Sequence, residues 1–513
     1  MLSPLGSEKA VVMHAGPDIK GVVSATAPPS AARGAVEATR VRSPRVERLA
    51  RGVAGADAHE RAALVEEFWS EIERRGTPLV EYVEYVDGAD GVDGADGPGR
   101  AEGASGAGVG VGIGAGVGRD PGLGTGTGTG PGPGDRTDGG DPADGELTHR
   151  AVTFLWRGHR ATRQVLLLVN RVVDREHLAD ALLSHVPGTD VWHLTYRLRA
   201  DHRAAYRMAA DISPGEPPAD PALLQRRLRS LSVYASHDPL NSQRLPSRWG
   251  QPDSSVFALP EAPAQPWAER RASVARGRVE RHRLPAGALG AERDVWAYLP
   301  PGGPRPGTPT VVLCDGDVWF GQLAFQDTLD ALIADGAVPP LAVLAPDAVD
   351  LHTRWYDLTA RDTYVHFLAD ELLPWAAGRW PLTTDPARTV VAGQSLGGLT
   401  ALYAGLLRPE RFGAVLAQSA SLWWRPGLPP GVPKSAPSGD LPWLVSRFIE
   451  KPRPPLRIHL DAGLHEGAMV GYSSALHEQL AVRGHSVTYS TYNGGHDYAC
   501  WRGCLADGLT AVL

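Results

Sequence analysis

The strongest constraint on the fold is a series of near-continuous apolar runs in the second half of the chain. They cover residues 310–314, 341–345, 389–392, 413–417 and 456–460. Strands without alternation of polar and apolar residues are buried on both faces, which is typical of a parallel sheet covered by helices. Segments with helical spacing of apolar residues lie between these runs. The pattern therefore predicts an α/β unit with a mostly parallel sheet over residues 263–513.

A different pattern precedes this unit. Three short strands with turn residues between them are predicted at residues 151–156, 164–169 and 191–196. We expect them to form a small antiparallel all-β sandwich, joined to the α/β unit by a Pro-rich segment. Apolar residues at helical spacing in residues 58–75 predict one helix before the sandwich.

Two further segments have compositions that do not support a packed core. Residues 1–57 are rich in Ala, Gly, Arg and Pro without sustained periodicity, and we expect them to be disordered. Residues 86–146 are a Gly-rich low-complexity insertion, which buries too little surface to offset the entropy of ordering it. The remaining residues, 58–85 with 147–262 and then 263–513, are the two predicted domains.

The charge balance and the cysteine count exclude several classes of protein. The 58 acidic and 51 basic residues give a formal net charge of −7, so no general field attracts nucleic acid or an anionic membrane. Cys314, Cys500 and Cys504 are too few for an extracellular disulfide framework, and we interpret them as buried thiols. Residues 1–30 contain no apolar stretch of the secretory type, and no segment has the composition of a transmembrane span. We therefore expect a cytoplasmic protein.

A serine in a sharp turn is the first candidate for catalysis. The segment Gly393-Gln-Ser-Leu-Gly397 joins the apolar run that ends at Ala392 to a helical pattern. Glycines two residues before and two residues after a serine allow the strand-to-helix turn that holds a nucleophilic hydroxyl above a sheet. Ser395 is therefore the predicted nucleophile, and the alternative is an ordinary Gly-rich turn.

A serine nucleophile needs a base, and the base needs an acid that orients it. His496 follows the last predicted strand, residues 486–492, and comes directly after two glycines, so it is the predicted base. The acid should follow the preceding strand, where Glu466 is the first choice and Asp461 is the alternative. His465 is expected to be a neighbour, because choosing it as the base would leave His496 and its glycines unexplained.

The charge that develops on a substrate oxygen needs N–H donors that are fixed in advance. The backbone N–H of Leu396, at the start of the predicted helix, is the first candidate. The second is expected in the Gly-containing loop after residues 310–314, from the backbone of Asp317 or Val318. The alternative is that this loop is a simple Asp-Gly turn.

Seven motifs between residue 152 and residue 502 point to one family. They are Val152-Thr-Phe-Leu-Trp156, Gly188-Thr-Asp-Val-Trp192, Asp238-Pro-Leu-Asn241, Asp315-Gly-Asp-Val-Trp319, Val391-Ala-Gly-Gln-Ser-Leu-Gly-Gly-Leu399, Ser419-Ala-Ser-Leu-Trp-Trp424 and Gly494-Gly-His-Asp-Tyr-Ala-Cys-Trp-Arg502. With these motifs the sequence resembles the enterochelin (enterobactin) esterase family, which hydrolyses ferric catecholate siderophores and has an esterase D-like α/β-hydrolase domain. The resemblance extends from about residue 152 to residue 513, and it includes an amino-terminal β-domain that most other esterases lack.

This resemblance implies a role for each candidate residue and a class of substrate. It implies that Ser395 is the nucleophile, His496 the general base and Glu466 the orienting acid. The implied substrate is a cyclic or linear triester of dihydroxybenzoyl-serine units that carries iron(III). The catecholate oxygens of such a substrate hold the iron, so the protein needs no cofactor and no metal ligands of its own.

An anionic ferric catecholate needs local cationic and aromatic groups on a protein whose overall charge is negative. Arg354 follows the run at 341–345, at the end of the sheet where ligands bind, and is the candidate partner of the catecholate oxygens. Trp319, Trp423 and Trp424 are candidates to stack on catechol rings. The alternatives are that these tryptophans belong to the core and that the arginine is paired or solvated.

Three other functions fit parts of this pattern. An acyltransferase related to the mycolyltransferases would use the same three residues and exclude water from the acyl-enzyme. A siderophore-binding protein without turnover would be expected to lack Ser395 or His496, and both are present. The predicted β-domain would be a separate carbohydrate- or protein-binding module if it bound a partner by itself.

Overall fold

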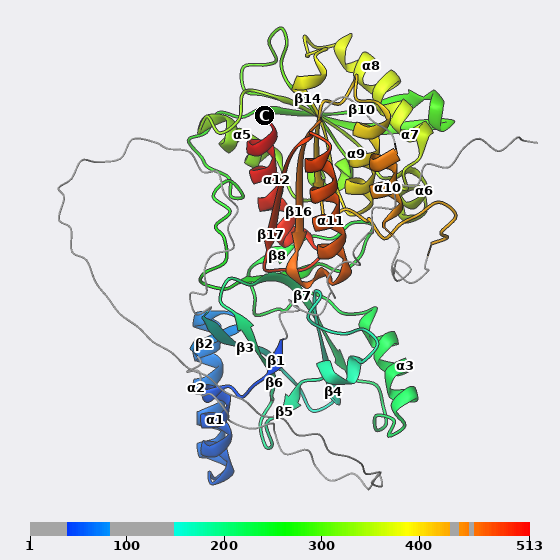
Figure 1. Cartoon of the computed structure of the whole chain (residues 1–513). Helices are drawn as coiled ribbons and strands as arrows, with labels where there is room; N and C mark the ends of the chain where they lie inside the picture. The colour runs from blue at the N-terminus through cyan, green and yellow to red at the C-terminus, as the bar shows by residue number, and fades with distance from the viewer. Residues whose placement is uncertain (1–37, 83–147, 431–440, 451–455) are drawn as a thin grey trace, which may run out of the picture.

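The computed structural model describes residues 38–82, 148–430, 441–450 and 456–513, which form two units stacked one above the other in Figure 1. The N-terminal unit, below, holds strands β1 to β9 and helices α1 to α3. The C-terminal unit, above, holds strands β10 to β17 and helices α4 to α12. The chain is a mixture of helices and strands, as the sequence predicts.

The C-terminal unit is built on an eight-stranded sheet in the order β10-β11-β13-β12-β14-β15-β16-β17. Neighbours among β12 to β17 pair in parallel, whereas β10 pairs antiparallel with β11, and β11 antiparallel with β13. The parallel strands therefore end at one edge of the sheet. The bounds are β10 (Arg278–Ala286), β11 (Ala291–Leu299), β12 (Thr310–Leu313), β13 (Ala342–Pro346), β14 (Thr389–Gln394), β15 (Ala414–Gln418), β16 (Arg457–Gly463) and β17 (Ser486–Tyr492).

Helices cover both faces of this sheet, as the complete burial of β12 and β14 requires. Leu399 of α9, Leu444 of α10 and Leu476 of α11 pack into one core, and Leu329 of α5 and Leu505 of α12 into another. Full burial of one leucine contributes about 1.5–3 kcal/mol. The bounds are α4 (Gly316–Trp319), α5 (Gln326–Ala334), α6 (Leu351–Asp357), α7 (Asp362–His366), α8 (Leu373–Ala377), α9 (Leu396–Leu407), α10 (Trp443–Glu450), α11 (Ala468–Val482) and α12 (Tyr498–Val512).

The N-terminal unit contains two antiparallel sheets. One has the order β1-β6-β3-β2 with β5 paired to β6, and the other has the order β4-β7-β9-β8. The two share a core in which Phe154 of β3 meets Tyr206 of β7 edge-on, with ring centroids 4.9 Å apart. The bounds are β1 (Thr39–Arg40), β2 (Leu79–Tyr82), β3 (His149–Arg157), β4 (Gln164–Val169), β5 (Ser184–His185), β6 (Val191–Arg199), β7 (Arg203–Asp211), β8 (Arg244–Leu245) and β9 (Ser254–Ala258).

The prediction that residues 1–57 are disordered is wrong for the part that the structure describes. Helix α1 (Pro44–Ala54) packs against helix α2 (Ala58–Arg75), and the Ser43 hydroxyl caps α1 by accepting the Val46 N–H. Its buried apolar residues are spaced three and four apart, as a helix requires, but arginines dominate the composition around them. These buried residues are Val46, Leu49 and Val53.

The first half of the chain differs from the prediction in a second way. The N-terminal unit is not all-β, because helix α3 (Pro221–Ser232) packs Leu228 against Leu166 and Leu168 of β4. The predicted Gly-rich insertion, residues 86–146, lies outside the described residues.

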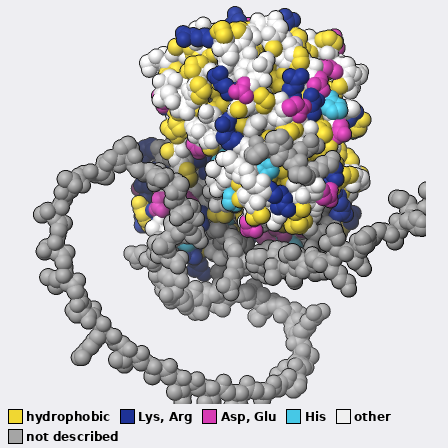
Figure 2. All heavy atoms as spheres, turned by 45° about the horizontal axis from the view of Figure 1, so that its top comes forward, with side chains coloured by type: hydrophobic (Ala, Val, Ile, Leu, Met, Phe, Trp, Pro, Cys, Tyr) yellow, Lys and Arg dark blue, Asp and Glu magenta, His cyan; other side chains and the backbone are white. Residues whose placement is uncertain are grey.

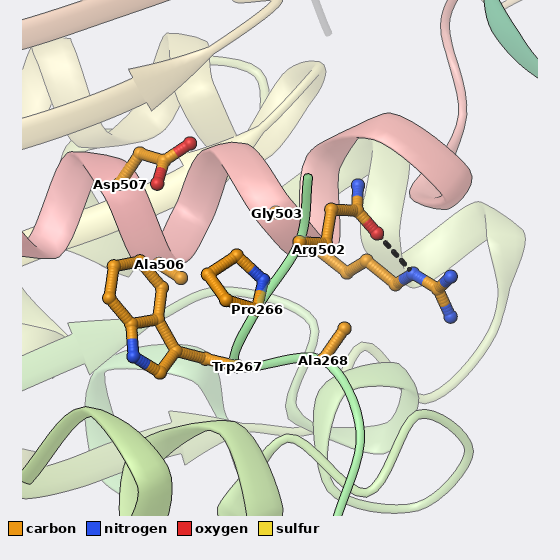
Figure 3. A pocket seen from close by; sticks show the side chains of 8 residues that line it. Pro266, Trp267, Ala268, Arg502, Gly503, Ala506 and Asp507 are labelled. Carbon is orange, nitrogen blue, oxygen red and sulfur yellow. Dashed lines mark hydrogen bonds between the residues drawn. The ribbon is translucent and has the colours of Figure 1, made fainter. Parts of the chain in front are cut away.

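The segment that joins the two units is fastened to the last helix. Figure 3 shows the shallow pocket where residues 266–268 run beside Arg502 and Gly503 of α12. The Gln265 amide donates to the Ala499 carbonyl (2.8 Å) and its oxygen accepts from Arg502 Nε (2.8 Å). A Cβ at Gly503 would lie 2.6 Å from Gln265 Cγ, so a larger residue there would displace the Gln265 side chain.

The surface carries charges of both signs. Figure 2, in which the C-terminal unit comes forward, shows Lys and Arg side chains interspersed with Asp and Glu. This mixture agrees with the absence of a general attractive field in the sequence. Within the described ranges, no helix combines the length and the apolar composition needed to cross a bilayer.

The docking of α1 gives a testable prediction. Replacing Leu49, which is 7% exposed, with Ala should lower the free energy of unfolding by about 2–4 kcal/mol, because the cavity is not refilled. Urea denaturation measures this loss. The control Arg51→Ala, on the exposed side of the same helix, should stay within about 0.5 kcal/mol of the unsubstituted protein. Equal, small effects of both changes would show that α1 does not pack as described.

Candidate active site

Ser395 stands on a sharp turn between β14 and α9. Its backbone is left-handed, with φ 59° and ψ −119°, which is costly for a residue with a side chain. A Cβ at Gly393 would lie 2.5 Å from the carbonyl oxygen of Gly397, so the two glycines let strand and helix meet. The turn therefore has the geometry that the Gly-X-Ser-X-Gly pattern predicts, with the serine at the end of a buried strand.

Three side chains from three strand ends form a continuous hydrogen-bonded chain. His496 Nε2 lies 2.9 Å from Ser395 Oγ, and His496 Nδ1 lies 2.7 Å from Glu466 Oε2. Glu466 lies in a short helical turn after β16, and His496 lies in the loop after β17. The Ser421 hydroxyl is also close, at 3.3 Å from Ser395 Oγ. The arrangement matches a nucleophile, a base and an orienting acid.

Glu466 is held as a buried carboxylate. It accepts hydrogen bonds from Ser419 Oγ (2.6 Å), the Gly463 N–H (2.9 Å) and Tyr492 Oη (3.2 Å). Burial favours the neutral acid, but the charge of His496 and these hydrogen bonds outweigh it and hold the pKa of Glu466 below its usual range. Glu466 is therefore ionised at neutral pH, as stabilising an imidazolium requires.

Asp461, the alternative acid, has a different environment. Its carboxyl accepts a hydrogen bond from Gln418 Nε2 (3.1 Å), and no hydrogen bond joins it to His496 in the described part of the chain. Burial raises the pKa of Asp461 to about 8, so at neutral pH it is largely a neutral acid. His465 bonds Asn493 Oδ1 through Nε2 (2.8 Å) and is a neighbour of the site, as expected. The structure thus brings Glu466, and not Asp461, to the imidazole.

The backbone N–H groups predicted as oxyanion donors differ in whether they already have a hydrogen-bond partner. Leu396 is the first residue of α9, where a backbone N–H has no partner within its own helix. The prediction for Val318 is wrong, because its N–H donates to the Asp315 carbonyl at 3.0 Å in the turn of α4. Asp317 stands one residue closer to the start of α4, and its backbone N–H stays the predicted second donor.

The sequence analysis missed the centre of this region, Asp315. It is fully buried and accepts bonds from Arg354 Nε (2.6 Å) and Nη2 (2.7 Å), Arg248 Nη1 (3.0 Å) and Gln394 Nε2 (2.9 Å). Burial opposes its charge, but Arg354 and Arg248 hold the pKa of Asp315 well below its usual range. The signal available in the sequence was its place directly after a buried strand, in the loop that was predicted to supply an oxyanion donor.

Trp319 therefore differs from its predicted role in substrate binding, and Arg354 is paired, whereas its contact with a substrate stays a prediction. Two nitrogens of the Arg354 guanidinium are already occupied by Asp315, and the side chain is 11% exposed. Trp319 is fully buried in the core between the sheet and α5, and its indole N–H donates to Gln394 Oε1 (3.2 Å). Each side chain is hydrogen-bonded to a residue that is distant in the sequence, Arg354 to Asp315 and Trp319 to Gln394. These contacts join separate segments in the interior of the C-terminal unit.

Trp423 and Trp424 belong to the segment that follows β15. They follow Ser421 in the chain, and each is 7% exposed. Trp423 packs at 6.0 Å from the ring of Trp355, at an interplanar angle of 36°. Stacking of these rings on a substrate stays a prediction.

The fold and the site define the class of protein, and comparison with known sequences agrees. The Esterase family matches residues 286–512, so the chain is a carboxylic ester hydrolase. The family described as "Enterochelin esterase, N-terminal" matches residues 151–268. The chain belongs to the enterochelin esterase family.

The alignments with similar proteins cover most of the length of those proteins. The iron(III) salmochelin esterase of Escherichia coli O6:H1 is 36% identical over 72% of this chain and 88% of that protein. The iron(III) enterobactin esterase of Dickeya dadantii is 34% identical over 71% and 87%. The crystal structure of the enterobactin esterase from Shigella flexneri in the presence of enterobactin is similar at a TM-score of 0.62 and 31% identity, covering 71% and 93%.

Asp461 gives a prediction about stability and pH. The folded protein keeps this proton up to about pH 8, whereas the unfolded carboxyl loses it near pH 4, so the contribution of Asp461 to the free energy of unfolding should fall as pH rises between these values. Asp461→Asn cannot ionise and lacks this contribution, so its stability relative to the unsubstituted protein should rise over the same pH range. Urea denaturation at several pH values measures the two slopes. Activity should change less than in Glu466→Gln, and a larger loss in Asp461→Asn would contradict the assignment.

Arg354 gives a prediction about its partner. Arg354→Ala leaves the buried carboxylate of Asp315 with one cation fewer, at a cost of up to about 3–5 kcal/mol in the free energy of unfolding. Hydrolysis of a neutral nitrophenyl ester and of a ferric catecholate ester should therefore fall by similar factors, as steady-state kinetics can measure. A loss confined to the ferric substrate would restore Arg354 as a substrate-binding residue.

Proposed function

We propose that this protein hydrolyses the ester bonds of a ferric catecholate siderophore such as enterobactin, through a Ser-His-Glu triad. The observation that carries the proposal is the hydrogen-bonded chain from Ser395 through His496 to Glu466. Its relatives supply the substrate class, since they are iron(III) salmochelin and enterobactin esterases that are 36% and 34% identical to this chain.

In the proposed first step, Ser395 Oγ attacks the ester carbonyl while His496 Nε2 accepts the hydroxyl proton. The charge on the substrate oxygen is stabilised by the backbone N–H of Leu396 and by that of Asp317. The ester C–O bond then breaks, and His496 returns the proton to the departing serine hydroxyl of the substrate. Water, activated by His496 in the same way, hydrolyses the acyl-enzyme and releases the acid.

Glu466 does not exchange protons in this scheme. Its carboxylate accepts Nδ1–H of His496, which fixes the tautomer with Nε2 free to take the Ser395 proton. Three donors hold the carboxylate from other sides, so it is fixed before the reaction begins. The imidazolium that forms is stabilised by a charge that needs no reorganisation.

We propose that iron(III) enters only with the substrate, held by catecholate oxygens, and that the protein uses no cofactor. Cutting the triester separates the three catechol units and weakens their joint hold on the metal, which allows iron release. The three cysteines are unpaired, which supports a reducing compartment such as the cytoplasm.

We propose two domains whose boundary falls near residue 262, with the N-terminal pair of sheets as a sandwich. The matched family ranges, 151–268 and 286–512, support a division in this part of the chain.

The triad is tested by substitution. Ser395→Ala and His496→Ala should each lower kcat by ~10³-fold or more, because the remaining groups cannot replace a missing member. Glu466→Gln should cost less, since it orients the base without reacting. Release of dihydroxybenzoyl-serine from ferric and iron-free triesters, followed by chromatography, measures the rates.

The same experiment separates the alternatives. An acyltransferase would transfer the acyl group to an added alcohol faster than to water. A binding protein would retain the ferric substrate without releasing product, and its Ser395→Ala variant would behave like the unsubstituted chain. Unchanged turnover in Ser395→Ala would overturn the proposed mechanism.

A further inference from the structure

The loop that carries His496 contains two adjacent glycines directly before the histidine. It runs from Asn493 to Asp497 between β17 and α12, and two of its five residues are Gly494 and Gly495. Glycine has no side chain to pack and has the largest conformational freedom of any residue. An imidazole on such a loop keeps its aim only if other groups fix the main chain.

The N-terminal unit supplies one such group directly at His496. Asn170, just after β4, accepts the His496 N–H with Oδ1 (2.9 Å) and donates from Nδ2 to the His496 carbonyl (3.3 Å). One amide side chain therefore holds the main-chain N–H and C=O of this residue. Asn170 is itself fixed, since its own N–H donates to the Ala205 carbonyl of β7 (3.0 Å).

Further contacts from the same unit hold the loop on both sides of His496. The Arg203 N–H donates to the Asn493 carbonyl (3.0 Å), before the glycines. The Ala205 N–H donates to Asp497 Oδ2 (3.0 Å), after them, and Asp497 caps α12 by accepting the Ala499 N–H. The loop is therefore enclosed between the two units rather than held by one of them.

The enclosure of the loop explains why residues 494 and 495 are glycines. Neither has a positive φ, so the backbone conformation alone does not demand glycine. The close contacts with the N-terminal unit favour glycine instead. A Cβ at Gly495 would lie 2.4 Å from Asn170 Oδ1, and a Cβ at Gly494 would lie 2.7 Å from the Arg203 carbonyl oxygen. The glycines make room for the N-terminal unit as well as for the imidazole.

We propose that Asn170 is a positioning residue of the esterase site: the N-terminal unit holds the peptide groups of His496 and so aims its imidazole at Ser395. This inference rests on the proposed role of His496 as the base. It assigns to the N-terminal unit a part in the chemical step. The contribution is geometric, because Asn170 reaches the main chain of His496 and not the reacting atoms.

The test compares kcat and KM in the full chain with nitrophenyl butyrate, which is neutral and small. Asn170→Ala should lower kcat by about 10- to 100-fold, as misplacement of a catalytic group by about 1 Å does. KM should stay within about twofold. The rate at which a fluorophosphonate labels Ser395 should fall in parallel with kcat. Asn170→Asp, which keeps the oxygen that accepts the His496 N–H, should recover part of both rates.

Gln265→Ala is the matched control. Gln265 is another amide side chain between the two units, but it bonds Ala499 and Arg502 of α12 rather than His496. Its loss should lower the thermal midpoint as much as that of Asn170, while kcat stays within about twofold. Equal falls of kcat in Asn170→Ala and Gln265→Ala would overturn the inference, because general docking would then explain both.

The remaining outcomes separate this inference from the proposed function. An inactive His496→Ala beside an unchanged Asn170→Ala would overturn the role of Asn170 and leave the proposed base in place. A fully active His496→Ala would overturn the proposed function itself. If Asn170→Ala folds poorly, Asn170→Leu decides, because it keeps a similar side-chain volume but makes neither hydrogen bond to His496: an unchanged kcat and labelling rate in that variant, beside an inactive His496→Ala, would also overturn the positioning role.

Discussion

Parallel pairing of the strands in the C-terminal unit is the constraint on which the rest of the structure depends. Because β14, β15, β16 and β17 run in the same direction, the residues that follow them meet at one edge of the sheet. Ser395, Ser419, Glu466 and His496 come after these four strands in turn, although 101 positions separate the first from the last. Each strand end delivers one group, and the hydrogen bonds between strands fix the distances among them.

The same burial has opposite effects on two carboxyl groups close together in the chain. Asp461 has a weak set of partners, so loss of solvent raises its pKa, whereas Glu466 has four donors, including His496, and stays charged. Asp315 follows the second pattern with two arginines around it. Several donors thus hold Glu466 and Asp315 in the charged form, whereas Asp461 lacks them, which agrees with the choice of Glu466 as the acid.

The sequence was informative where the chemistry is local and uninformative where a partner comes from elsewhere. The serine turn, the order of acid and base, and the buried strands all follow from spacing within a few residues, and the structure brings Ser395, His496 and Glu466 together. The hydrogen bonds of Arg354 to Asp315 and of Trp319 to Gln394 were not predicted, because these partners are 39 and 75 positions away. Helix α1 was missed because arginines dominate the composition around its three buried apolar residues, which gain their partners only by packing against α2.

Because the His496 loop is enclosed between the two units, activity depends on the contact between them as well as on the folding of each unit. A site built wholly within one unit is lost when that unit unfolds, but residues 493–497 take hydrogen bonds from both units. Partial openings have smaller free energies than global unfolding, and relative motion of two docked units is expected unless their interface is large and hydrophobic. Activity should therefore be lost at a lower temperature or denaturant concentration than the secondary structure of either unit. Inactivation then reports separation of the two units at their interface.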